Sequence, residues 1–239
     1  MTEIQPKSWA PSFADGVAEI TRQMRVLVEP GQIVELRALA VKTNYGRPHV
    51  ESGFFDYEHL EDMARAALQI TRRAKGVYYT LNPVRRDLLA RRCNRIDRAE
   101  EGELAADKDI LKRRWLLVDA DPVRDPFISS TDEEKANAWT TVLAVRDFLS
   151  KWPAPVVADS GNGYHLLYRI DLPADDNGQV QKVLQALAQR FDNDLVKIDQ
   201  KVCNPGRICK MPGTLARKGD SIPERPHRWA KLLEVPGNE

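Results

Sequence analysis

An α+β fold is predicted for this chain of 239 residues from three features of its sequence. Several short runs of apolar residues alternate with polar residues at a period of two, which is typical of strands in antiparallel sheets. Amphipathic segments with the period of a helix lie between some of these runs. Other strand-like runs follow one another with only a turn between them. This mixed order favours an α+β architecture over a doubly wound parallel sheet.

The first half of the chain contains three strand-like runs separated by breakers and helical segments. Gly46-Arg47-Pro48 lies between the first two runs, so we expect a hairpin there. Asn82-Pro83 marks a turn after the third run. The expected elements are a helix over 13–24, strands over 33–41 and 49–55, a helix over 57–73, a strand over 76–81 and a helix over 85–98.

The second half begins with the most apolar run of the chain, which we expect to be a buried strand. Ser130 or Thr131 caps the helix that follows, because acidic residues fill its first turn. The expected elements are a strand over 115–120, a helix over 130–151, strands over 155–160 and 165–170, a helix over 177–191 and a strand over 195–202.

Composition excludes several classes of protein. Apolar residues make up 42% and charged residues 30% of the chain, and no apolar run approaches the 18 residues of a membrane-spanning helix, so no membrane partner is expected. The polar N-terminus lacks the apolar core of a signal peptide. Three cysteines without CxxC spacing indicate neither a disulfide framework nor a zinc site. We therefore expect a cytoplasmic protein.

One segment concentrates positive charge, although the formal net charge of the chain is only +1. Residues 81–98 hold six arginines against two aspartates. If residues 85–98 form a helix, Arg91, Arg95 and Arg98 lie on one stripe and make a candidate DNA-binding surface. A solvated charged face is an equally good interpretation, but arginine suits phosphate contact better than lysine does.

The pair Asp119 and Asp121 is the most informative feature. The two carboxylates end the apolar run Leu116–Val118, and residues i and i+2 of a strand point to the same side, roughly 6.6 Å apart at their Cα atoms. Two acids on one face of a buried strand repel each other and are costly to desolvate. A divalent cation removes both costs, and Mg²⁺ or Mn²⁺ prefers such oxygen ligands.

A glycine-rich turn follows, at Ser160-Gly161-Asn162-Gly163-Tyr164-His165. Glycines let the backbone come close to a ligand, and outward amides together with Ser160 and Asn162 form an anion-binding concavity around Gly163. His165 is placed to donate to a phosphate oxygen. An ordinary hairpin is the competing interpretation, because Asn-Gly is a common hairpin sequence.

A third acid and two cations come from the last part of the chain. Residues 196–202 alternate, which places Asp199 on a polar sheet face, and the turn over 204–214 presents Arg207 and Lys210. Arginine suits bidentate phosphate binding, and lysine acts as a point charge. A surface ion pair with loop cations is the competing interpretation.

Together these motifs predict a site for a nucleoside triphosphate and two metal ions. Two Mg²⁺ or Mn²⁺ ions can clamp the attacking and leaving oxygens of a phosphoryl displacement. The expected metal ligands are Asp119, Asp121 and Asp199. The residues expected to hold the triphosphate are Ser160, Asn162, Gly163, His165, Arg207 and Lys210.

In this order, the three motifs resemble the archaeo-eukaryotic primase superfamily, whose pattern is an acid-x-acid strand, a small-residue turn ending in histidine and a later strand aspartate. The resemblance covers about residues 30–228 and is most like the catalytic domain of CRISPR-associated primase-polymerases. Flanking segments that share it are Thr80-Leu81-Asn82-Pro83, Leu89-Ala90-Arg91-Arg92, residues 129–134 and Ala216-Arg217-Lys218-Gly219-Asp220.

The resemblance implies an archaeo-eukaryotic primase fold, in which an RRM-like catalytic subdomain packs on an N-terminal α/β subdomain with the active site in the cleft. The boundaries that we expect are a flexible leader over 1–11, a catalytic domain over 12–228 divided at about 113/114, and a tail over 229–239. Relatives often carry helicase, helical priming or adaptation-nuclease domains, so we expect this chain to correspond to an excised catalytic core.

The implied activity is template-directed nucleotidyl transfer, as a DNA primase and DNA polymerase that uses NTPs or dNTPs. The expected partners are single-stranded or primed DNA and, through the resemblance, CRISPR-adaptation proteins or fused helicase and nuclease domains. Tyr79 or Tyr164 is a candidate for stacking on the base or crowding the sugar, with core packing the better role for Tyr79. Two alternatives stay open: a catalytically inactive nucleotide- or DNA-binding module, and a nuclease that uses the same acids.

Overall fold

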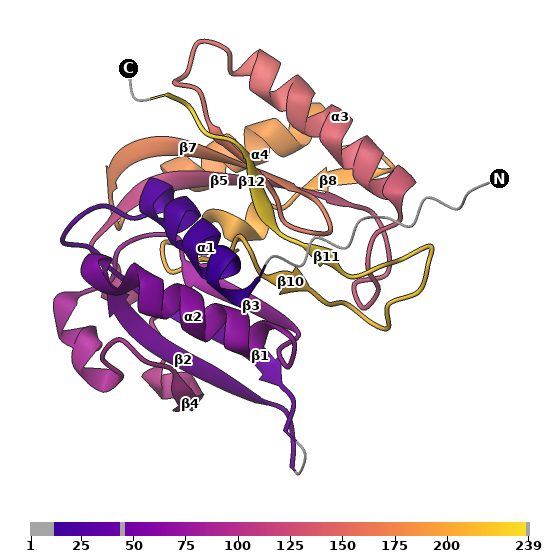
Figure 1. Cartoon of the computed structure of the whole chain (residues 1–239). Helices are drawn as coiled ribbons and strands as arrows, with labels where there is room; N and C mark the ends of the chain where they lie inside the picture. Colours follow the sequence, from indigo (N-terminus) through magenta and orange to yellow (C-terminus); the bar gives the residue numbers. More distant parts are fainter. Residues whose placement is uncertain (1–11, 44–45, 238–239) are drawn as a thin grey trace.

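The computed structural model describes residues 12–43 and 46–237, so the predicted leader over 1–11 lies outside the described residues. Two five-stranded antiparallel sheets stack on each other, and each carries two helices (Figure 1). The α+β prediction is therefore confirmed. None of the helices in these described ranges is long and apolar enough to cross a membrane.

The first sheet has the strand order β4-β2-β1-β3-β9. Helices α1 and α2 pack against each other on one of its faces (Figure 1). In α2 the buried side chains recur every three to four residues, as the predicted amphipathic pattern requires. The elements are α1 (Phe13–Leu27), α2 (Leu60–Thr71), β1 (Ile33–Val41), β2 (His49–Asp56), β3 (Gly76–Thr80), β4 (Asp97–Ala99) and β9 (Ile208–Lys210).

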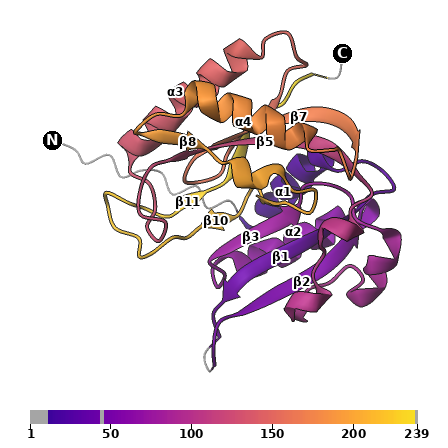
Figure 2. The same ribbon diagram turned by 180° about the vertical axis from the view of Figure 1, so that it is seen from behind.

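The second sheet has the order β12-β6-β7-β5-β8, with helices α3 and α4 on one face (Figure 2). Thr131 caps α3 and exchanges hydrogen bonds with Glu134, the capping box that the acidic first turn indicated. The elements are β5 (Lys112–Pro122), α3 (Asp132–Phe148), β6 (Val156–Asp159), β7 (Tyr164–Pro173), α4 (Gln179–Phe191), β8 (Val196–Ile198) and β12 (Lys231–Glu234).

Short elements complete the chain. They are the 3₁₀ helices η1 (Tyr57–His59), η2 (Arg86–Arg91), η3 (Glu101–Glu103), η4 (Asp107–Asp109) and η5 (Gln200–Cys203), and the strand pair β10 (Leu215–Ala216) and β11 (Arg228–Trp229).

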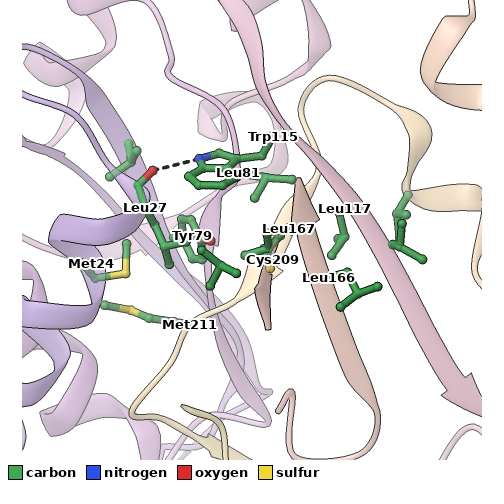
Figure 3. Close-up of a cluster of buried hydrophobic side chains, with 14 of the residues drawn as sticks. Met24, Leu27, Tyr79, Leu81, Trp115, Leu117, Leu166, Leu167, Cys209 and Met211 are labelled. Atoms are coloured by element: carbon green, nitrogen blue, oxygen red, sulfur yellow. Dashed lines mark hydrogen bonds between the residues drawn. The ribbon is translucent and has the colours of Figure 1, made fainter. Parts of the chain in front are cut away.

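The two sheets share one hydrophobic core, because the chain returns from the second sheet to the first. After β8 it adds β9 to the edge of β3, and it then comes back to pair β12 with β6. Trp115 of β5 packs in this core, and its Nε1 donates to the carbonyl of Leu27 at the end of α1, 3.0 Å away (Figure 3). Residues on both sides of the expected division at 113/114 therefore contribute to one core and to the first sheet.

Two expectations about the second half of the chain need correction. The segment over 229–239, expected to be a tail, instead contributes β12 to the second sheet, where Lys231 pairs with Asp159 and Leu232 with Ala158 of β6. The strand expected over 195–202 stops at Ile198, where the chain turns into η5.

The predicted arginine helix over 85–98 is wrong. Only Arg86–Arg91 is helical, as a 3₁₀ turn, because the next residues pair with the edge of β2. The amide of Phe54 donates to the carbonyl of Arg92, and the amide of Asn94 donates to the carbonyl of Phe54. Arg91, Arg95 and Arg98 therefore do not form one helical stripe.

Replacing Trp115 with phenylalanine should lower the free energy of unfolding by about 2 kcal/mol, because the Leu27 carbonyl loses its donor and the core loses volume. Chemical denaturation measures the change. Trp152→Phe is the matched control, since Trp152 is 39% exposed and should change stability by less than about 0.5 kcal/mol. Equal effects of the two substitutions would contradict this view of the core.

Candidate active site

A cavity of about 440 Å³ contains the predicted site. Both sheets contribute to its lining, β5, β7 and η5 from one side and β3 and β9 from the other. All eight predicted side chains of the metal and nucleotide sets line it: Asp119, Asp121, Ser160, Asn162, His165, Asp199, Arg207 and Lys210. The structure therefore brings these residues together, while their roles stay predictions.

Asp119 and Asp121 project from the same face of β5 into this cavity. Burial and the neighbouring charge of Asp119 raise the pKa of Asp121. For Asp119, burial acts in the same direction, but the adjacent His165 outweighs it and lowers the pKa. Oδ1 of Asp119 accepts no hydrogen bond, although it forms an ion pair with His165. The two carboxylates therefore repel each other and are incompletely satisfied.

His165 faces Asp119 directly across the β5–β7 pair. Its Nε2 lies 3.4 Å from Oδ1 of Asp119, within ion-pair distance, and its Nδ1 lies 3.5 Å from Sγ of Cys209. Burial disfavours the charged imidazole, but the Asp119 carboxylate and Cys209 raise the pKa of His165 well above its ordinary value. Asp119 and Cys209 therefore favour the protonated imidazole and contact both of its ring nitrogens.

The glycine-rich turn connects β6 to β7 and lies against the aspartate strand. A Cβ added at Gly163 would lie 2.4 Å from the Ala120 carbonyl and 2.8 Å from Oδ1 of Asp121. Only glycine therefore allows this approach. The hydroxyl of Ser160 donates to the Gly163 carbonyl and accepts from its amide, and Oδ1 of Asn162 accepts from the Ser130 amide. Much of the polar capacity of the turn is used to hold its own shape.

Lys135 and Asp159 stabilise the glycine-rich turn. Nζ of Lys135 on α3 lies 2.6 Å from Oδ1 of Asp159, which also accepts from the Gly161 amide at 2.7 Å. Tyr164, a candidate for base stacking, instead packs 5.0 Å from Trp139, and Lys135 lies over its ring. Tyr79 is buried, as core packing requires.

Asp199 lines the cavity from the start of η5 and not from a strand, which corrects the prediction for this residue. It follows β8 and caps η5, where its Oδ1 accepts from the Lys201 amide at 2.8 Å, so it does not belong to an alternating strand face. Its own amide donates to the carbonyl of Asp119, which keeps the two residues adjacent. Among the described residues, no three or more His, Cys, Asp or Glu side chains form a group that could hold a metal ion.

Lys210 is the last residue of β9 and not part of a turn, which corrects the prediction for this cation. Its side chain is 8% exposed and its Nζ donates to the Leu215 carbonyl at 2.9 Å. Desolvation lowers the pKa of Lys210 to about 7. Arg207 precedes β9 and donates to Oδ1 of Asn204 and to the Lys201 carbonyl.

Three further residues of this site were not predicted from the sequence, and they are Tyr78, Arg124 and Lys218. Nη1 of Arg124 lies 3.7 Å from Oδ1 of Asp121, and its Nη2 is buried without a partner. Lys218 and Tyr78 line the cavity, and Nζ of Lys210 lies 5.4 Å from the Tyr78 ring. The segment 216–220 was noted for its sequence, which is a usable signal for Lys218. Nothing in the local sequence distinguishes Arg124 or Tyr78.

Comparison with solved structures gives a structural likeness. No family model matches the chain, and no curated protein matches it in sequence. The crystal structure of primase RepB' is similar, with a TM-score of 0.48 and 12% sequence identity. The likeness covers 92% of this chain and 56% of that chain, so this chain spans little more than half of that length. At this identity the likeness concerns the fold alone.

Gly163→Ala should lower the free energy of unfolding by about 1–3 kcal/mol, because the new methyl group collides with backbone of β5. Gly102→Ala is the matched control, since no heavy atom lies within 4 Å of a Cβ there. Thermal and chemical denaturation compare the two. If both alanines are tolerated equally, the close approach of turn and aspartate strand is refuted.

Proposed function

We propose that this protein is a metal-dependent nucleotidyltransferase that extends nucleic acid on a template, acting as a primase and polymerase. One observation carries the proposal: the carboxylate pair Asp119 and Asp121 shares a cavity with His165 and with buried or half-buried cations. A triphosphate with bound metal needs both sets of charges. A metal-dependent nuclease would explain the acids but not the cluster of cations opposite them.

The donor set of the cavity fits a divalent cation in combination with a nucleotide. Asp119 and Asp121 would hold Mg²⁺ or Mn²⁺, since Oδ1 of Asp119 lacks a hydrogen-bond partner and the two carboxylates repel each other. Asp199 is the third candidate ligand. Such an ion supplies charge neutralisation and activation of the attacking hydroxyl. Because the protein offers no complete ligand group, phosphate oxygens would complete the coordination.

The remaining residues of the cavity would bind and orient the triphosphate. His165 presents a ring whose protonated form Asp119 favours and whose orientation Asp119 and Cys209 fix. Arg207, Lys210 and Lys218 add positive charge on the opposite wall. Arg124 holds Asp121 from the side, so we assign it a positioning role.

The finer parts of the assignment have separate support. The order β5-α3-β6-β7-α4-β8 is a β-α-β-β-α-β unit, which agrees with the RRM-like catalytic half that the resemblance implies. The proposed association with CRISPR adaptation, and with helicase or nuclease partners, rests on the sequence resemblance.

Synthesis on single-stranded DNA tests the proposal. Wild-type protein, labelled NTPs or dNTPs and Mn²⁺ or Mg²⁺ should yield product on primed templates, and new chains on unprimed templates if the protein is a primase. Asp119→Asn/Asp121→Asn should reduce product at least about 100-fold, because the charges that stabilise the transition state are lost. Asp171→Asn, an exposed carboxylate of β7 outside the cavity, is the control.

Two results would contradict the proposal. Undiminished synthesis by the double variant would exclude Asp119 and Asp121 from catalysis. No synthesis on any template, with nucleotide binding retained, would identify a binding module instead of an enzyme.

Nucleotide affinity should fall as pH rises from 7 to 9. Lys210, with a pKa of about 7, loses its proton over this range in the free protein, whereas a bound triphosphate favours the charged amine. Binding therefore takes up a proton, and the Lys210 contribution weakens affinity by up to about tenfold per pH unit. Calorimetry in two buffers of different ionisation enthalpy measures the uptake.

Lys210→Met should bind more weakly at pH 7 and take up fewer protons. His165 also titrates above its ordinary range, so the comparison with this variant isolates Lys210. Identical pH dependence in the two proteins would exclude Lys210 from phosphate binding.

A further inference from the structure

We propose that the rim of the active-site cavity is a binding track for a single strand of nucleic acid, with Phe127 as its base-stacking platform. The rim consists of Phe127 and six cations: Lys42, Arg72, Arg73, Lys75, Arg217 and Lys218. Its role as a template track rests on the proposed function, but strand binding itself can be tested without nucleotide or metal.

Phe127 is the most exposed large apolar side chain of the described residues, at 67%. It lies in the loop between β5 and α3, and Nζ of Lys75 lies 5.5 Å from its ring centroid. The loop is held in place, because the Phe127 amide donates to Oδ1 of Asp125 and the Ser129 hydroxyl donates to the Lys218 carbonyl. An aromatic ring held open to solvent beside a cation offers a stacking surface at little cost in entropy.

Hydrogen bonds join the segments that carry the cations of the rim, so these segments are neighbours. The Lys42 amide donates to the Arg73 carbonyl, and the Arg217 amide donates to the Lys75 carbonyl. The Arg217 guanidinium donates to the Arg72 carbonyl. The end of β1, the residues after α2 and the segment after β10 therefore lie side by side, and Lys75 lies over the ring of Phe127 in the β5–α3 loop.

The charge of this rim stands out against the rest of the chain, whose formal net charge is +1. Of the acids near it, Glu51 lies 3.8 Å from Arg73 and Asp220 follows Lys218 by two residues. Lys75, Arg217 and Lys218 also line the cavity that holds the two aspartates. A phosphate backbone that follows these cations would therefore lead its strand into the active site.

The combination of ring and cations favours a single strand over a duplex or an acidic protein. Bases stack on an aromatic ring only when their faces are free, as in single-stranded nucleic acid. An acidic protein would use the cations but would leave the exposed ring unexplained. The arginines first expected to bind DNA are less suitable, because Arg95 and Arg98 pair with Asp97 and Glu100, and Arg91 donates to backbone carbonyls.

Fluorescence anisotropy with a labelled 20-nucleotide DNA strand, without nucleotide or divalent metal, tests the track. Phe127→Ala should bind about tenfold more weakly, whereas Phe127→Trp should bind within about twofold of wild type, because a base stacks on either ring. Phe148→Ala is the matched control. Phe148 is 52% exposed, and the Arg190 guanidinium lies 4.5 Å from the centre of its ring. It lies on α3, which covers the face of the second sheet that points away from the first sheet (Figure 2).

The salt dependence tests the cations. Arg72→Ala/Arg73→Ala should reduce the slope of log K against log salt by about 1.4, since each lost phosphate contact removes about 0.7 for a single strand. Arg22→Ala/Arg65→Ala removes two exposed arginines from the outer surfaces of α1 and α2 and should leave the slope unchanged.

Nucleotide-induced thermal shifts on the same proteins separate this inference from the proposed function. Weaker strand binding by Phe127→Ala with a wild-type nucleotide shift supports the track. Wild-type strand binding by both the Phe127→Ala and the Arg72→Ala/Arg73→Ala variants overturns it, as does failure of the wild-type protein to bind the strand. Strand binding at the rim without any nucleotide shift would support the track and contradict the proposed function.

Discussion

The contact between Asp119 and His165 is the interaction on which the rest of the site depends. Asp119 and His165 face each other at a cross-strand position of β5 and β7, where His165 is buried and Asp119 is partly buried. Each makes the charge of the other tolerable, since burial alone would neutralise both. Neighbouring elements are arranged around this pair. The Asp199 amide binds the Asp119 carbonyl, β9 brings Cys209 against His165, and Gly163 lets the turn approach Asp121.

The return of β9 to the first sheet creates the cavity. By pairing with β3, β9 places Cys209 and Lys210 in the lining of the cavity that also holds the aspartates. The chain crosses to the first sheet at β9 and returns to the second sheet at β12, and the two sheets share one hydrophobic core (Figure 3). The two sheets are therefore expected to unfold together, and the distance between the acids and the facing cations is fixed by packing.

Local sequence patterns predicted the elements and most of the site, and long-range pairing explains the failures. The i, i+2 spacing of Asp119 and Asp121 needs only a strand, and a strand formed. The arginine helix failed because the backbone at Arg92 and Asn94 pairs with Phe54, a partner about 40 residues away. The burial of Lys210 and the approach of Arg124 and Tyr78 depend likewise on which strands become neighbours, which periodicity does not encode.

The most direct test of the central claim is a titration with Mn²⁺ followed by electron paramagnetic resonance, with and without a nucleoside triphosphate. The cavity offers a carboxylate pair but no complete set of metal ligands, so the protein alone should bind Mn²⁺ weakly. Addition of the triphosphate should produce a tightly bound Mn²⁺ population that Asp119→Asn/Asp121→Asn abolishes. Equal Mn²⁺ binding with and without nucleotide, or a bound population that survives in the double variant, would contradict the account.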